Sequence, residues 1–380
     1  MEERIYSVLI LHALGDTIGF KNGDWEFNYD DMSKLEVLDY VNELIYEFIE
    51  LGGVNGIDLK GWHVSDDTFL HLAIGRSMLK FKKKINEPFI LDIKRNIQQE
   101  AIRMQNEKEG KYKAENNEID SNNVNRYMGV TTQIEIMKFT KKYDARFGKY
   151  DSFSGGNGAA MRSLVIGLCL HDEKNRELMS DLSVVSSQIT HNNAIGYLAG
   201  FTAALFTALA ITNVPIKKWV YILLDYLKSD TLKKYLSLDN LDQIHDHNMY
   251  IRYWQKYIDT KFDAKKEPIR NRSYSNPMHR IRYFHDNFHK DDISYQIGGS
   301  GFLCMIMAYD AVLDCDGKWE KLIVYAILHS GDSDTIGAVA GGLYGAVYGM
   351  GDVPLHMLEH LERKKEIEKL ARDIYKKYWK

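Results

Sequence analysis

The fold is decided by residues 194–212, which read AIGYLAGFTAALFTALAIT and contain no charged side chain. Their length is about that of a bilayer crossing. However, the stretch is rich in Ala, Gly and Thr, so it is less apolar than a typical membrane span, and no basic cluster precedes it. We therefore predict a helix buried on all sides in a large core, and we expect no membrane partner.

Helical signals continue on both sides of this stretch. The chain of 380 residues contains five prolines, and strand-like alternation is scarce. Several segments place apolar residues at helical spacing, namely Leu178–Thr190, Lys217–Leu236, Lys318–Leu328, Leu355–Lys380 and part of Lys82–Asn125, which would end in an exposed loop from Lys108. There is no internal repeat and no convincing linker. These patterns predict an all-α protein, a single compact orthogonal multi-helix bundle over residues 1–380.

The composition excludes some classes of partner. With 45% hydrophobic residues, 27% charged residues and a net charge of -4, the chain resembles a soluble globular protein and offers no basic face for nucleic acid. Three cysteines, Cys169, Cys304 and Cys315, lie far apart, and none forms a CxxC pair. So few thiols predict buried side chains and no disulfide framework, as in a protein of the reducing cytoplasm.

Two clusters of carboxylates are the candidates for chemistry. The first is HVSDDT at 63–68, followed by an apolar helical pattern, and the second is HSGDSDT at 329–335, followed by a run of small residues. Acidic residues and serine also cap helix N-termini, so capping alone would account for Asp66 and Asp67. His329 is expected to support the second turn from behind the carboxylates.

The second cluster favours a metal site. Asp332 and Asp334 stand between two nearly charge-free stretches, and two like charges about 4 Å apart repel by about 4 kcal/mol at an effective dielectric of about 20. A divalent cation would remove that cost, and hard oxygen ligands suit Mg²⁺, Mn²⁺ or Ca²⁺ better than zinc. An EF-hand loop fails because Ile336 and Leu343 occupy ligand positions. Four carboxylates would neutralise two cations, which predicts a binuclear hydrolase.

Five motifs in order resemble one known family. They are GDTIG at 15–19, SDDT at 65–68, GGNGAAMR at 155–162, Thr190-His191, and GDSDTIG at 331–337. Together they are similar to the ADP-ribosylglycohydrolase family over nearly the whole chain. The resemblance implies an all-α fold with two Mg²⁺ ions, or Mn²⁺, held by Ser65, Asp66, Asp67, Asp332, Asp334 and Thr335. Asn157 and Ser330 are small departures, because the family often has Cys or Gly at the first position and Gly at the second.

The resemblance also implies how a substrate is held. The glycine-rich loop would cradle a diphosphate with its backbone N–H groups, through Gly155, Gly156, Asn157, Gly158 and Ala159. A turn that only packs two helices is the alternative. Independently of the resemblance, Gly298, Gly299 and Ser300 are candidates either to line the adenosine pocket or to form only a turn. Tyr295, Phe302 and Tyr309 are the candidates to stack on adenine. His191 is either a site residue or a structural histidine.

Three further segments point to one branch of the family, which releases ADP-ribose from arginine. They are NGDWEF at 22–27, GWHVSDDT at 61–68 and MAYDAVL at 307–313. In that branch Asp66 or Asp67 would take a proton from the attacking water, and Glu26 would contact the departing guanidinium, unless it is only a surface charge. The expected partner is ADP-ribosylated arginine on proteins, with ADP-ribose as the product.

Two alternatives remain open. A member of another branch would act on ADP-ribosyl-serine, poly(ADP-ribose) or another ADP-ribosyl conjugate, and the metal motifs are common to all branches. The fold could also serve as a non-catalytic ADP-ribose-binding protein, although the complete ligand set argues against that. The polar stretch Thr260–Asp292 matches no part of the family pattern and is a candidate location for substrate selectivity.

Overall fold

The computed structural model describes residues 1–26, 34–114, 123–139, 149–237, 239–270, 276–288 and 297–380. Helices build the described part of the chain, and extended pairing there is limited to two isolated bridges, Gly156–Ser300 and Phe262–Pro268. The helices are α1 Glu2–Phe20, α2 Lys34–Glu50, α3 Asp66–Lys80, α4 Glu87–Lys108, α5 Val130–Phe139, α6 Ala160–Cys169, α7 Arg176–Gln188, α8 Ala194–Ile211, α9 Trp219–Lys228, α10 Asp230–Lys233, α11 Leu241–Lys261, α13 Pro277–Phe288, α14 Gly301–Asp314, α15 Trp319–Ala326, α16 Ser333–Tyr348 and α17 Lys364–Tyr378. The predicted all-α class is confirmed.

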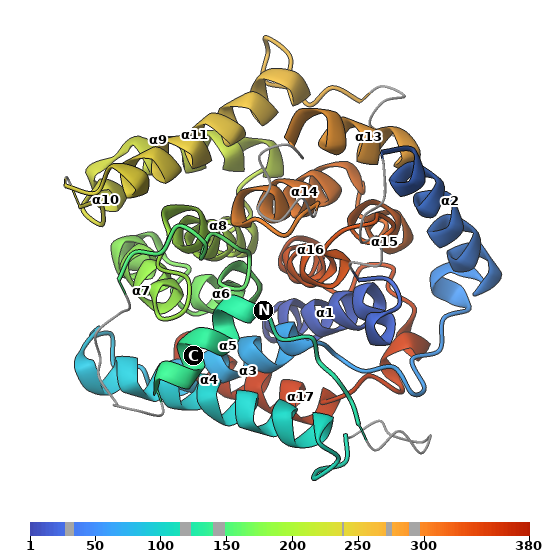
Figure 1. The fold of residues 1–380 in the computed structure, drawn as a ribbon, viewed down its shortest axis with the longest axis horizontal. Coiled ribbons are helices and arrows are strands. Elements are labelled where there is room, and N and C mark those ends of the chain that lie inside the picture. The colour runs from blue at the N-terminus through green and yellow to red at the C-terminus, as the bar shows by residue number, and fades with distance from the viewer. Residues whose placement is uncertain (27–33, 115–122, 140–148, 238, 271–275, 289–296) are drawn as a thin grey trace.

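Helix α8 is the charge-free stretch, and it lies in the core as predicted. All of its residues are buried, and it packs against α6, α7, α11, α14 and α16. In Figure 1, α8, α14 and α16 are seen nearly end-on, whereas α4 and α11 lie lengthwise at opposite sides of the molecule. The helices therefore cross at large angles, as expected of an orthogonal bundle.

Among the described helices, α1 and α16 make the most extensive contact. A Cβ atom at Gly15 would overlap the carbonyl of Gly337, and one at Gly19 would overlap the carbonyl of Ser333. Further along, Gly341 meets the carbonyl of Leu11 in the same way. The contacts advance in opposite directions along the two helices, so the helices are antiparallel. Only glycine allows backbones to approach this closely.

One predicted helix is broken in the structure. The periodic segment Lys217–Leu236 forms two helices, α9 and α10, which separate at Ser229. Ser229 has an extended backbone, and its hydroxyl donates to the carbonyl oxygen of Tyr226 at 2.7 Å. A serine hydroxyl that bonds to a nearby backbone carbonyl competes with the backbone hydrogen bonds of the helix. The apolar spacing therefore continues past Ser229, although the helix ends there.

A second group of buried charges lies where α11, α13 and α14 meet. We call Lys261, Arg280, Asp310 and Asp314 the paired cluster. Lys261 Nζ lies 3.0 Å from Asp310 Oδ1 and 2.6 Å from Asp314 Oδ2, and Arg280 pairs with both carboxylates. All four side chains are buried. Arg280 thereby fixes α13, which belongs to the polar stretch noted in the sequence, to the core.

Candidate metal centre

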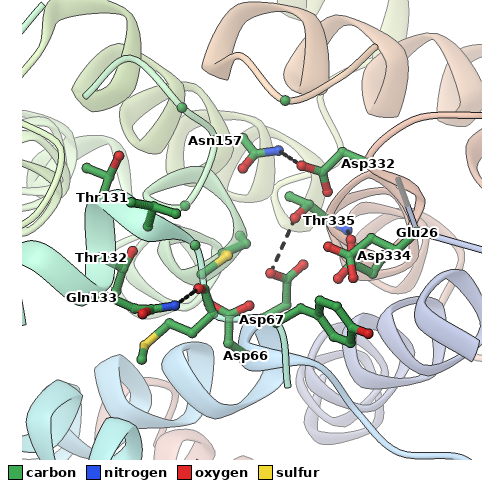
Figure 2. A pocket seen from close by; sticks show the side chains of 18 of the residues that line it. Glu26, Asp66, Asp67, Thr131, Thr132, Gln133, Asn157, Asp332, Asp334 and Thr335 are labelled. Carbon is green, nitrogen blue, oxygen red and sulfur yellow. Dashed lines mark hydrogen bonds between the residues drawn. The ribbon is translucent and has the colours of Figure 1, made fainter. Parts of the chain in front are cut away.

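The acidic residues of both sequence clusters meet at one place in the fold. Asp66 and Asp67 are the first residues of α3, while Asp332 and Asp334 lie at the start of α16. Figure 2 shows their carboxylates directed towards a common space, with Glu26 on the same side as Asp334. The four aspartates are buried. We call these residues, together with Glu26 and Asp16, the acidic centre.

Asp16 is the member for which the sequence suggested no role. It lies within α1, and its carboxylate accepts hydrogen bonds from the backbone N–H groups of Ser65 at 3.0 Å and Thr68 at 3.1 Å. The Thr68 hydroxyl also donates to it. Asp16 therefore fastens the start of α3 to α1. A carboxylate within the buried part of α1 was the available signal, but it did not indicate the partners of Asp16.

Helix capping at the start of α3 is the work of Ser65, whereas Asp66 and Asp67 belong to the acidic centre. Ser65 is the N-cap of α3, and its hydroxyl accepts from the Asp67 N–H at 3.1 Å. The capping bond therefore uses neither the Asp66 nor the Asp67 carboxylate, and both residues line the cavity described below. Asp332 has the N-cap position of α16 without a capping side-chain bond. Its Oδ2 instead accepts from Asn157 Nδ2 at 2.7 Å.

Burial and mutual repulsion dominate the electrostatics of the acidic centre. Burial raises the pKa of Asp67 well above its usual value, and the carboxylates of Asp16, Asp66 and Asp332 raise it further. The pKa of Asp334 rises for the same reason, first through burial and then through Glu26, Asp67 and Asp332. A cluster with this charge is costly without a cation.

The side chains present fit hard divalent cations. Oxygen atoms of Asp16, Asp67 and Asp334 lie within 4.8 Å of one another, and so do those of Glu26, Asp332 and Asp334. Asp334 belongs to both groups. Two buried carboxylate oxygens, Asp67 Oδ2 and Asp332 Oδ1, have no hydrogen-bond partner among the described residues. Oxygen-only donors of this kind suit Mg²⁺ or Mn²⁺.

The remaining predicted ligands differ in their placement. Thr335 lines the cavity described below, and its hydroxyl donates to Asp67 Oδ1 at 3.3 Å, as drawn in Figure 2. Ser65 is fully buried, and its hydroxyl is occupied by the capping bond. Its assignment as a metal ligand stays a prediction.

A cavity of about 550 Å³ opens onto the acidic centre. Glu26, Asp66, Asp67, Asp332, Asp334 and Thr335 line one part of it. Gly156, Asn157, Gly158 and Gly299 line another part. A third wall is the segment 125–133, which leads into α5. Sequence reasoning had given this wall no role.

The glycine-rich loop and the second glycine turn form one unit. The N–H of Asn157 donates to the carbonyl of Gly299 at 3.2 Å, and the N–H of Gly301 donates to the carbonyl of Gly155 at 3.0 Å. The Asn157 amide also donates to the carbonyl of Gly298 at 2.9 Å. Because the same amide reaches Asp332, it connects the loop to the acidic centre.

Other members of the two predicted loops serve the helices that follow them. Ala159 is the N-terminal flanking residue of α6 and is buried. Ser300 caps α14, since its hydroxyl accepts from the N–H of Leu303 at 3.3 Å. The helix-packing turn that the sequence left open therefore exists beside a cavity-lining loop.

Comparison with known proteins identifies the family of the chain. A family model described as ADP-ribosylglycohydrolase matches residues 1–380. The chain belongs to the ADP-ribosylglycohydrolase family. A protein of Acanthamoeba polyphaga mimivirus named as an ADP-ribosyl glycohydrolase is 35% identical over 96% of this chain and 68% of its own length.

Two further relatives carry more specific names. ADP-ribosylhydrolase ARH1 of Dictyostelium discoideum is 28% identical over 98% of this chain and 94% of its own length. ADP-ribosylhydrolase ARH3 of Danio rerio is 25% identical over 62% of this chain and 60% of its own length. A solved ADP-ribosylglycohydrolase-related protein complex shares the fold with a TM-score of 0.60 at 17% identity, covering 99% of this chain and 98% of that one. Membership in the family indicates hydrolysis of ADP-ribosyl bonds.

Two of the three aromatic candidates for stacking on adenine lie away from the cavity. Tyr309 is fully buried, and its hydroxyl donates to the carbonyl of Ile216 at 3.0 Å inside an aromatic core. Phe302 stacks on Tyr253 and is also fully buried. Neither ring lines the cavity, so both assignments are corrected. Tyr295 lies outside the described residues.

Two exposed aromatic side chains line the cavity instead. Phe153, next to the glycine-rich loop, is 83% exposed, and Tyr127 is 52% exposed. Aromatic residues were abundant in the sequence, and their abundance does not distinguish core from cavity. The useful signal for Phe153 was its position directly before the loop.

Two histidines near the site are held in the neutral form. His191 lines the cavity and shares a hydrogen bond with the Thr190 hydroxyl at 2.8 Å, and burial, together with Arg162, lowers its pKa to about 3. His329 Nδ1 accepts from the N–H of Gly331 at 3.0 Å, while Nε2 donates to the carbonyl of Ala326. His329 thus supports the turn before Asp332, in agreement with the expectation.

Proposed function

We propose that this protein is a Mg²⁺-dependent hydrolase that releases ADP-ribose from arginine side chains. The observation that carries the proposal is the acidic centre on the wall of a cavity that also contains a glycine-rich loop. Such a cavity offers carboxylates at one end and backbone N–H groups at the other. A substrate with a diphosphate and a cationic leaving group matches both.

The arginine part of the proposal rests on Glu26 and its surroundings. Asn22 Oδ1 accepts from the N–H of His63 at 2.9 Å, and Asn22 Nδ2 donates to the carbonyl of Gly61 at 3.1 Å. Two of the three segments that favoured arginine, 22–27 and 61–68, are therefore joined near Glu26, which lines the cavity. A carboxylate there complements a guanidinium. The match to ARH1 over 98% of the chain gives further support.

The acidic centre supplies the candidate ligands for the cations. Asp66, Asp67, Asp332, Asp334 and Thr335, with Ser65 as a sixth candidate, would hold two Mg²⁺ or Mn²⁺ ions, and Asp16 stands beside them. When bound, the ions would supply Lewis-acid stabilisation of oxygen atoms on the ribose and of the attacking water.

The residues of the chain would carry the remaining chemistry. Asp66 or Asp67 accepts a proton from water as the water oxygen bonds to ribose C1 and the bond from C1 to the guanidine nitrogen breaks. The proton then returns to the leaving nitrogen, so that arginine departs as guanidinium beside Glu26. Carboxylates around the sugar stabilise the positive charge that develops there. N–H groups of the glycine-rich loop other than that of Asn157, which donates to Gly299, would hold the diphosphate.

The deciding experiment uses two matched peptides, one ADP-ribosylated on arginine and one on serine. The protein is incubated with each peptide in Mg²⁺ and in excess chelator, and free ADP-ribose is measured. Metal-dependent release from the arginine peptide alone is the expected result. Release from the serine peptide alone would reassign the substrate, and release from neither would favour a binding protein.

We also propose that the 380 residues act as one domain in a reducing compartment, the cytoplasm. All three cysteines are free and buried, which favours a compartment where thiols persist. Helices from both ends of the chain, α1, α16 and α17, pack on one another, and this favours a single folding unit.

A further inference from the structure

Arg126 is a buried arginine beside the cavity that the family motifs did not include. It lies between Asn125 and Tyr127, which line the cavity, while its own side chain is 2% exposed and does not line it. Its guanidinium donates to Glu107 Oε2 from Nε at 3.0 Å and from Nη2 at 2.8 Å. It also donates to both oxygens of Glu362, at 2.6 Å and 2.7 Å. Arg126 thereby joins α4 to the segment before α17.

The fifth N–H donor of the same guanidinium reaches the turn at 64–66, which leads into Asp66. Arg126 Nη1 donates to the carbonyl of Val64 at 2.6 Å, and Glu362 Oε2 accepts from the N–H of Val64 at 3.0 Å. Both backbone groups of the residue two positions before Asp66 are therefore fixed. Each of the five N–H donors of Arg126 has a partner, an arrangement that the three donors of lysine could not reproduce.

The backbone after Arg126 holds Asp66 itself. The N–H of Asp66 donates to the carbonyl of Arg126 at 3.1 Å. A hydrogen bond from the backbone of Gly129 reaches the Asp66 carboxyl and partly offsets the rise in its pKa, which burial and the neighbouring carboxylates cause. The segment 126–129 thus contacts Asp66 at its backbone and at its carboxylate.

We propose that Arg126 is a positioning residue that sets the orientation of the Asp66 carboxylate towards the cation and the substrate. It acts through the Val64 backbone on one side and through its own carbonyl on the other. The proposal rests on the proposed function, in which Asp66 is a catalytic and ligating residue. Groups that orient ligands typically change metal affinity or activity by about 10- to 100-fold when they are replaced.

Arg363 provides a matched control within the same layer of the protein. Like Arg126 it is buried, it pairs with two glutamates, Glu100 and Glu366, and it lies over the ring of Phe69. Its hydrogen bonds go to those glutamates, not to the turn at 64–66. Replacing either arginine by lysine keeps the positive charge and removes hydrogen bonds to the paired glutamates, of which Glu366 is partly exposed. Only Arg126→Lys is expected also to disturb the hydrogen bond to the turn at 64–66.

The test compares the full-length wild type with Arg126→Lys and Arg363→Lys. Thermal melts first define the unfolding range of each protein, and all measurements are made below it. The Kd for Mg²⁺ is measured by calorimetry, and kcat and KM are measured with whichever ADP-ribosylated peptide is cleaved. For Arg126→Lys we expect at least a roughly 10-fold weaker Kd or a roughly 10-fold lower kcat, with KM within about 3-fold. For Arg363→Lys we expect a lower thermal midpoint with Kd and kcat within about 2-fold.

A second variant covers the case in which Arg126→Lys does not fold. Glu362→Gln keeps the size of the side chain and an acceptor for the Val64 N–H, but it removes the charge that pairs with Arg126. We therefore expect a smaller change of Kd or kcat in the same direction. Unchanged Kd and kcat in the folded Arg126 or Glu362 variant would overturn the proposal, and so would an equal loss in Arg363→Lys. If the wild type cleaves neither peptide, the proposed function fails while the Mg²⁺ calorimetry still decides the role of Arg126.

Discussion

The acidic centre and the paired cluster contain the same kind of residue under opposite electrostatic conditions. In the paired cluster, burial alone would raise the pKa of Asp310, but Arg280 and Lys261 hold it below its usual value. In the acidic centre, burial raises the pKa of Asp66, and Asp16 and Asp332 raise it further. The aspartates of both groups are buried, so burial is not what separates them.

The difference lies in the source of the counter-charge. The chain supplies its own cations to Asp310 and Asp314, and those residues hold α11, α13 and α14 together. The acidic centre instead repels itself and, among the residues described, keeps unpartnered oxygen atoms directed at a cavity. A buried carboxylate cluster that the protein does not neutralise is therefore a better indicator of a cation site than acidity alone.

The largest effect that would test this comparison is expected at Asp334, which belongs to both groups of candidate ligands. Asp334→Asn should lower kcat on the cleaved peptide by on the order of 10⁴-fold, as for other residues that act as part of one catalytic unit. In excess chelator the same variant should be more stable than the wild type, because one repelling charge is gone. Chemical denaturation measures the stability. Equal activity would contradict the assignment of the site.

The opposite outcome is expected at the paired cluster. Asp310→Asn leaves Lys261 and Arg280 with one carboxylate fewer, and losing a partner of a buried ion pair typically destabilises a protein by about 3–5 kcal/mol. Urea unfolding should show this loss while kcat of the folded protein stays within about 2-fold. A variant that lost activity without losing stability would mean that the paired cluster serves the reaction.

In the metal-free protein, the two clusters should also change the free energy of unfolding in opposite directions as pH rises. Burial raises the pKa of Asp16 to about 6 from an ordinary value of 3.8. Its contribution to the free energy of unfolding is therefore fully present below about pH 4 and is lost as pH rises through 6. A tenfold difference in proton affinity between the folded and unfolded protein corresponds to about 1.4 kcal/mol. Asp310, whose pKa is lowered, contributes above about pH 4 and loses that contribution in acid.

Urea midpoints between about pH 4 and 7 in chelator measure this third effect. The wild type and Asp16→Asn should diverge over that range, with the wild type losing stability relative to the variant as pH rises. Saturating Mg²⁺ should remove the divergence, because a bound cation favours the ionised carboxylates. Parallel curves with and without Mg²⁺ would contradict a cation at the acidic centre.

Local patterns in the sequence predicted much of the fold and part of the site. The buried helix α8 and the separate starts of α3 and α16 follow from charge and periodicity over short windows. Asp16 and Arg126 could not be found in this way. Asp16 acts on residues about fifty positions away, and Arg126 reaches Glu362 across more than two hundred. Such partners depend on how the helices pack, which no local window contains.

The aromatic assignments failed for a related reason. Tyr309 lies on α14, where every residue is buried, and periodicity cannot show which side of a fully buried helix faces a cavity. Phe153 lies outside any helix and carries no periodic signal, although it lines the cavity. Surfaces formed by loops are therefore the part of this site that the sequence described least well.

The glycine contacts between α1 and α16 have a consequence for reading natural variation in this chain. Asp16 and Asp334 sit on the two helices whose spacing Gly15 and Gly19 permit, since any larger side chain there would meet the opposing backbone. A methyl group added at Gly15 would therefore push apart two halves of the acidic centre without touching a carboxylate. A genetic variant of this kind would abolish function while every candidate ligand remained intact. A survey restricted to ligand positions would classify it as neutral.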